Sequence, residues 1–290
     1  MTGNISLGAG AMTILPITPG VRVTRRRGPH VAHTGANSLC TPRFCTRRTG
    51  QGLTVEHDLT PGEISDELAV LLAAELDDLG VLRGQPEFEA VFTGIVQSVA
   101  SDGEPDDAWY RFYRNSLHRL ESGSAAFAPV HRRAASLVVG RRVVDLGSCF
   151  GFFPLRLALA GLDVTATDLS APTMDLLART STRLERSLRT EVCDAARVPL
   201  PDRVADTVTV LHLLEHLDPT ASAAVLEEAM RLARRRVVVA VPFEDVPRAC
   251  YGHVQRFDLD ALQATAAAWR TSGIRATVTE YHGGWLLLDR

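Results

Sequence analysis

The run VVDLGSCFGFFPLRLA, Val143–Ala158, decides the fold predicted for this chain. Its apolar start is typical of a buried strand, which ends at Asp145. A turn containing Gly147 and Gly151 follows, and an apolar helix begins after it. Glycine lets the backbone come close to a ligand, and a strand, a glycine-bearing turn and a helix together are typical of a nucleotide-binding unit.

A second acid strengthens this interpretation. The next apolar run, 162–166, leads to Asp168, which follows Asp145 by 23 residues. An acid about 20 residues beyond the glycine turn, at the tip of the neighbouring strand, is placed to accept hydrogen bonds from ribose hydroxyls. The turn and the spaced acid together predict a nucleotide site.

Strand and helix patterns alternate from Arg141 onward, which predicts a doubly wound, mostly parallel α/β sheet of the Rossmann-like kind. The tail, 274–288, has the pattern of two strands joined by a short turn, so we expect an antiparallel last strand. The expected strands are 142–146, 163–167, 189–192, 207–211 and 236–241, and the expected helices are 151–160, 172–184, 219–233 and 259–272.

Length and composition limit the class of protein. The chain has 290 residues, 46% of them hydrophobic, which is enough for a substantial core. The net charge is −3 and all 31 basic residues are arginine, so no global positive field attracts nucleic acid or a membrane surface, and no lysine can serve as a base. No apolar run approaches the ~18–20 residues of a membrane span. We therefore expect neither a nucleic-acid partner nor a membrane.

The sequence divides into three predicted regions. Residues 1–52 form an Arg-rich extension expected to be disordered, because residues 1–50 contain seven arginines and no acid. This extension is either a basic arm for a polyanion or an unstructured addition. Residues 53–140 form a helical substrate or lid region, and 141–290 form the nucleotide-binding domain.

The helical region begins with a capping pattern at Thr60, Pro61 and Glu63, which predicts a helix from that point to Gly80. Further helices are expected over 87–99, 107–120 and 124–139. An aromatic group between Trp109 and Tyr113 is interpreted either as core or as a surface for a ring-shaped acceptor. The five cysteines form no CxxC pair, so we expect reduced thiols and a cytoplasmic protein.

Five βα-type strands followed by a terminal hairpin resemble the class I methyltransferases that use S-adenosylmethionine (SAM). The segment VPLPDRVADTVTVLHLLEHL, 198–217, is similar to that family's run through its fourth strand. Cys149 departs from the pattern, since the family commonly has a third glycine there. A dehydrogenase that binds NAD is the rival, but the missing middle glycine and the hairpin speak against it. The resemblance implies SAM as cofactor, bound by Asp145, Gly147, Ser148, Gly151, Asp168, Leu169, Asp194, Ala195 and Leu211.

Histidines and acids follow the fourth and fifth strands, where ligands bind in doubly wound sheets. The segment His212-Leu-Leu-Glu215-His216 resembles the ExxEH segment of quinone-pathway O-methyltransferases, with histidine in place of the first glutamate. This resemblance implies a divalent metal held by His212, Glu215 and His216; the alternative is a metal-free pair that shapes the loop. The candidate catalytic residues are His216, His253 and Glu215, because a hydroxyl acceptor must lose its proton to a base.

Stretches from Leu53 to the end, among them LTPGEISDELAVLLAAEL and DLGSCFGFFPL, resemble the mycofactocin oligosaccharide methyltransferases. That resemblance implies O-methylation of a glucose hydroxyl. We expect a SAM-dependent O-methyltransferase for a small molecule or a glycan. Two alternatives remain open: an RNA methyltransferase that uses the basic arm, and a catalytically silent nucleotide-binding regulator. The sequence indicates no oligomeric state.

Overall fold

The computed structural model describes residues 20–26, 28, 37–100 and 105–290. They fall into two compact units whose boundary lies between Ala126 and Phe127. The predicted boundary at 140/141 is therefore too late. Helix α4 (Ala128–Leu137) belongs to the C-terminal unit, because Val130 and Ala134 pack into the core of that unit's sheet.

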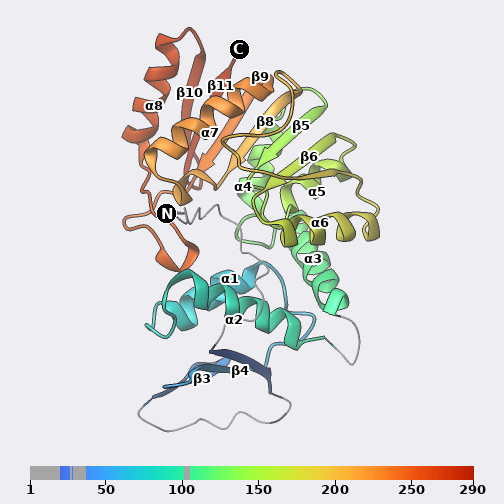
Figure 1. The fold of residues 1–290 in the computed structure, drawn as a ribbon, viewed down its shortest axis with the longest axis vertical. Helices are drawn as coiled ribbons and strands as arrows, with labels where there is room; N and C mark the ends of the chain where they lie inside the picture. Colours follow the sequence, from blue (N-terminus) through green and yellow to red (C-terminus); the bar gives the residue numbers. More distant parts are fainter. Residues whose placement is uncertain (1–19, 27, 29–36, 101–104) are drawn as a thin grey trace, which may run out of the picture. The chain divides into compact units, whose positions relative to one another are not determined.

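The C-terminal unit contains a seven-stranded sheet in the order β10-β11-β9-β8-β5-β6-β7 (Figure 1). Strand β11 pairs antiparallel with β9 and β10, and the other pairings are parallel. The predicted fold class, with a reversed last strand, is confirmed. The strands are β5 (Arg142–Leu146), β6 (Asp163–Asp168), β7 (Arg189–Val192), β8 (Ala205–Leu211), β9 (Ala233–Val241), β10 (Arg275–Glu280) and β11 (Gly284–Asp289).

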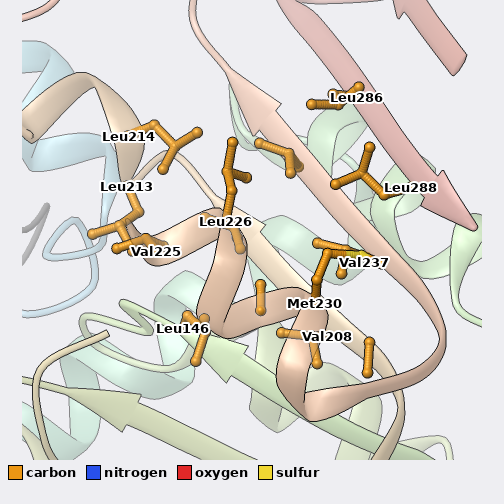
Figure 2. Packing of buried hydrophobic residues seen from close by; sticks show 14 of the residues in the cluster. Leu146, Val208, Leu213, Leu214, Val225, Leu226, Met230, Val237, Leu286 and Leu288 are labelled. Carbon is orange, nitrogen blue, oxygen red and sulfur yellow. The ribbon is translucent and has the colours of Figure 1, made fainter. Parts of the chain in front are cut away.

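Helices cover both faces of this sheet. Alternate residues of β9 enter different cores, with Val237 and Val239 on one face and Val238 on the other. The first core lies under α7 (Pro219–Leu232) and α8 (Leu259–Thr271), and Figure 2 shows α7 side chains such as Leu226 packed beside strand residues. The second core lies under α4 and α5 (Phe152–Leu159), while α6 (Ala171–Arg183) contacts β6 and β7.

The N-terminal unit contains a second sheet, in the order β1-β4-β3-β2, where the sequence predicted disorder up to residue 52. The sequence interpretation missed that arginines of this segment pair with acids from beyond it. Arg48 contacts Glu87 at 2.6 Å, and Arg43 contacts Asp58 and Glu63 at 2.8 Å each. Residues 1–19, 27 and 29–36 of the predicted extension lie outside the described residues. The strands are β1 (Val21–Arg25), β2 (Ser38–Cys40), β3 (Phe44–Thr49) and β4 (Gly52–His57).

The first helix of this unit starts later than predicted. The Glu63 side chain does reach back to the Thr60 amide at 2.8 Å, but α1 begins only at Glu67. The Asn115 amide donates to the carbonyls of Pro61 and Ile64, so these carbonyls do not serve a helical turn. The helices are α1 (Glu67–Leu72), continued by a π-helical turn η1 (Ala73–Asp77), α2 (Gly84–Ser98) and α3 (Pro105–Ser122).

The aromatic group of α3 is core rather than an open surface. Trp109, Phe112 and Tyr113 are buried, and the ring of Phe112 meets those of Trp109 and Phe92 edge to face.

One cysteine pair corrects the expectation of reduced thiols. Cys40 and Cys45 lie opposite each other on β2 and β3 and form a disulfide. Cys149, Cys193 and Cys250 are not in disulfides. In the described ranges, every helix is too short or too polar to cross a bilayer.

Candidate active site

The glycine turn is tied to the tip of β6 by backbone and side-chain bonds. Ser148 donates its amide to the Thr167 carbonyl at 2.8 Å, and Cys149 donates its amide to Asp168 at 2.9 Å. Gly147 and Gly151 have φ values of 69° and 70°, a region where only glycine is unstrained. A Cβ on Gly151 would also come within 2.4 Å of Leu177. The sequence folds this way because both glycines are required by the backbone path.

Asp168 lies at the floor of a pocket at the carboxyl edge of the sheet. Its carboxylate accepts the amides of Cys149 and Ser170 at 2.9 Å each, and burial raises its pKa above the ordinary value. Five of the predicted donor residues line this pocket: Gly147, Asp168, Leu169, Asp194 and Ala195. The sequence did not single out the other lining residues, which are Cys193, Ala196, Leu213, Leu217, Ala221 and Val225. In the sequence, these residues could be noticed only as apolar positions that follow the third and fourth predicted strands.

The structure places Asp145 beneath the turn, outside the pocket lining. Its two oxygens accept the hydroxyls of Thr209 at 2.5 Å and Ser148 at 2.7 Å. Burial raises the pKa of Asp145 to about 6, against the effect of these bonds. Asp145 and Ser148 therefore support the turn from below. Leu211 also lies outside the pocket lining and packs against the core under α4 and α5.

A second group of polar side chains follows β8 and β9 at the same edge. The chain leaves β8 through His212, whose φ is 53°, into the short helix η2 (Leu214–His216). The carbonyl of Glu215 accepts the amides of Val254 and Gln255 at 2.8 and 3.0 Å. These bonds bring the loop that follows β9 against η2, so that the rings of His216 and His253 lie 4.7 Å apart.

The side chains of this group are buried and only partly paired. His253 Nδ1 lies 2.8 Å from Glu244 Oε2, and this Glu244 contact orients the imidazole. Burial lowers the pKa of His216 to about 4, so its ring is neutral at pH 7. Within the described part of the chain, Glu215 Oε1 lies 3.1 Å from His212 Nδ1, whereas Glu215 Oε2 and His216 Nδ1 have no hydrogen-bond partner. Buried polar atoms are nearly always satisfied, so a ligand is the natural partner for these.

The three residues predicted to hold a metal are not gathered as one set. Ligand atoms of Glu215, His216 and His253 lie within 4.8 Å of one another, whereas His212 is not part of this group. His212 instead places Nδ1 3.1 Å from Glu215 Oε1 and stacks its ring edge to face on Phe127, 4.6 Å away.

Sequence reasoning missed two residues near this group: His131, which lies in α4, and Phe127, which directly precedes that helix. Phe127 and His131 lie beside this group, with the ring of His131 5.9 Å from Phe127 and 5.4 Å from Phe153. Burial and the charge of Arg156 lower the pKa of His131 to about 3. The sequence carries no local signal for them, because α4 precedes the first strand of the domain.

The comparisons with known proteins agree with this geometry. Residues 144–241 match a family model described as a methyltransferase domain. No curated protein matches the chain.

Solved structures similar to this chain include two methyltransferases. One is a SAM-dependent methyltransferase from Aquifex aeolicus, at 16% identity and a TM-score of 0.43, covering 60% of this chain and 97% of that one. The second is magnesium protoporphyrin IX methyltransferase from Synechocystis PCC 6803 with bound SAM, at 18% identity and a TM-score of 0.44, covering 66% and 86%.

The family match spans β5 to β9 and so includes the glycine turn, Asp168 and the segment that follows β8. The reversed strand β11 completes the sheet that the sequence predicted for this family. Residues 144–241 therefore contain a methyltransferase domain, and S-adenosylmethionine is its methyl donor.

Proposed function

We propose that this methyltransferase transfers the methyl group of SAM to a hydroxyl oxygen of a small molecule or glycan. The observation that carries the proposal is the buried group Glu215, His216 and His253, with Glu244 behind His253, at the same sheet edge as the donor pocket. A sulfonium methyl is intrinsically reactive, so alignment and exclusion of water account for much of the catalysis. A hydroxyl acceptor additionally needs a group that takes its proton, and this histidine–carboxylate group supplies one.

The roles divide between two sets of residues. Asp168 accepts hydrogen bonds from the ribose, Asp194 and Ala195 lie beside the adenine, and Gly147 leaves room for the donor at the turn. Asp145, Ser148, Gly151 and Leu211 hold the strand tips in place. The catalytic residues are His216, His253 and Glu215. His253 receives the proton at Nε2 while its Nδ1 stays paired with Glu244.

We favour a glucose hydroxyl of the mycofactocin oligosaccharide as the acceptor, on the sequence resemblance that extends over both units. The RNA alternative has less support, because Arg43 and Arg48 are committed to acids of their own unit. A cytoplasmic location stays a prediction, and it no longer rests on reduced thiols, because Cys40 and Cys45 form a disulfide.

The test is transfer of a labelled methyl group. The protein is incubated with methyl-labelled SAM and, separately, a glycan and cofactor fraction, total RNA, or buffer. We expect label in the glycan fraction and a methyl ether in the product by NMR. Label in RNA alone, or on nitrogen or carbon, contradicts the proposal. Donor binding without transfer to any fraction would support the regulator alternative instead.

A further inference from the structure

We infer that Glu215, His216 and His253 form a binding site for a divalent transition-metal ion. These residues follow β8 and β9, and we call this part of the active site the acceptor half; the donor half is the pocket around Asp168 with the glycine turn. One ligand atom from each residue lies within 4.8 Å of the others, a spacing that small side-chain movements close around an ion. Two histidines and one carboxylate leave open coordination positions in known metal sites. The inference rests on the proposed function only for the role of the ion, not for its binding.

The ligand atoms are available and buried. The Glu215 side chain is 1% exposed; its Oε1 lies 3.1 Å from His212 Nδ1, and its Oε2 has no hydrogen-bond partner among the described residues. His216 forms a hydrogen bond to the Gly252 backbone, while its Nδ1 is buried and unpaired in that part of the chain. A buried carboxylate oxygen without a partner is costly, and a cation beside Glu215 Oε2 and His216 Nδ1 removes that cost.

The surroundings of the three residues also fit a metal site. A ligating histidine usually pairs its second ring nitrogen with a carboxylate or a carbonyl, which fixes the ring. His253 meets this condition through Glu244, and His216 meets it through Gly252. His212 contacts the Glu215 carboxylate at 3.1 Å, so we assign it as a neighbour that orients a ligand.

The donor set selects the kind of ion. Imidazole nitrogens suit Zn²⁺, Co²⁺, Fe²⁺ or Ni²⁺ better than Mg²⁺ or Ca²⁺, which prefer oxygen ligands. Held by Glu215, His216 and His253, such an ion would act as a Lewis acid and lower the pKa of the acceptor hydroxyl. The hydroxyl would lose its proton to water, and its oxygen would form the new bond to the methyl carbon as the carbon–sulfur bond breaks. With the ion bound, His216 and His253 act as ligands instead of taking the proton themselves.

The experiment measures metal binding without turnover. Protein lacking a histidine tag is stripped with a chelator and titrated with Zn²⁺ by calorimetry and with Co²⁺ by visible absorption. We expect one tight site per chain. His253→Asn, His216→Asn and Glu215→Gln should each lower the affinity by about 100-fold or more, and Glu244→Gln by about 10–100-fold.

Controls separate the site from general effects. His282→Asn makes the same change at an exposed histidine and should leave the affinity unchanged. His212→Asn should keep one metal per chain. Unaltered donor affinity in every variant shows that the domain is folded.

The inference is overturned if wild-type protein binds neither ion, if His253→Asn binds as tightly as wild type, or if His212→Asn alone abolishes binding. Full methyl transfer by metal-free protein in the presence of chelator overturns the role assigned to the ion, while leaving the proposed function intact. Metal binding without methyl transfer to any hydroxyl would support the metal site and contradict the proposed function.

Discussion

The two halves of the sheet's carboxyl edge differ in how completely their polar groups are paired. In the donor half, both oxygens of Asp168 accept backbone amides, and both oxygens of Asp145 accept hydroxyls. In the acceptor half, Glu215 is equally buried, yet only its Oε1 has a polar neighbour, His212 Nδ1 at 3.1 Å, and its Oε2 has no hydrogen-bond partner among the described residues. The donor half is therefore assembled before its ligand arrives, whereas the acceptor half is left incomplete.

This difference separates two kinds of residue. A buried carboxylate with several donors defines a fixed shape, which suits the one donor that every turnover requires. Buried polar atoms without a hydrogen-bond partner can be paired by an acceptor molecule or an ion. Substitutions in one half should therefore leave the ligand of the other half largely unaffected.

The largest effect should come from the acceptor half. His253→Ala removes the imidazole that Glu244 orients, and we expect turnover to fall by about 10²–10⁴-fold, as for other acid–base groups. The affinity for S-adenosylhomocysteine, measured by calorimetry, should stay unchanged. A parallel loss of donor affinity would mean that the two halves are not independent.

A smaller effect is expected from the donor half. Asp168→Ala leaves the Cys149 and Ser170 amides unpaired and removes the ribose acceptor, so donor affinity should fall by about 100-fold. The control is Asp175→Ala, an exposed acid on α6. Calorimetry that shows wild-type donor affinity in Asp168→Ala would remove this residue from the site.

Lowering the pH should change the free energy of unfolding in opposite directions through His131, beside the acceptor half, and Asp145, in the donor half. The pKa of His131 is lowered to about 3, so below pH 6.5 the unfolded state binds its proton first, and stability is lost as the pH falls toward 3. The pKa of Asp145 is raised to about 6, so the folded state binds its proton first and gains stability as the pH falls below 6. Each full proton difference changes the unfolding free energy by about 1.4 kcal/mol per pH unit.

The test is urea unfolding at pH 7 and pH 5. His131→Phe should lose less stability than wild type on acidification, and Asp145→Asn should lose more. Parallel pH profiles for wild type and both variants would contradict these assignments.

The smallest effect concerns the turn between the halves. Cys149 has a φ of 49°, in the left-handed region that favours glycine. Cys149→Val should cost about 1 kcal/mol of unfolding free energy, because β-branched residues are strained there. Cys149→Gly relieves the backbone strain but raises the conformational entropy of the unfolded chain, so the free energy of unfolding should hardly change. Thermal unfolding of the two variants side by side provides the measurement.

The sequence predicted the C-terminal sheet closely because its signals are local. Buried parallel strands appear as apolar runs, and Asp218 and Asp258, directly before the predicted helices, cap α7 and α8 with their side chains. The N-terminal sheet was missed because it is assembled by long-range pairing, with β1 parallel to the distant β4, and because its buried residues Phe44 and Val55 are few and scattered among arginines. In the site, both histidines were proposed from the sequence, but the Glu244–His253 contact and the place of His131 depend on tertiary packing.

The bonds from Val254 and Gln255 to the carbonyl of Glu215 have a consequence for engineering the enzyme. They couple two segments that lie almost 40 residues apart in the chain, so neither segment has an independent conformation. Because the donors and the acceptor are all backbone groups, a chimera can change side chains in 243–257 as long as the loop keeps its length and path. A loop of another length would break these bonds and separate the imidazoles of His216 and His253.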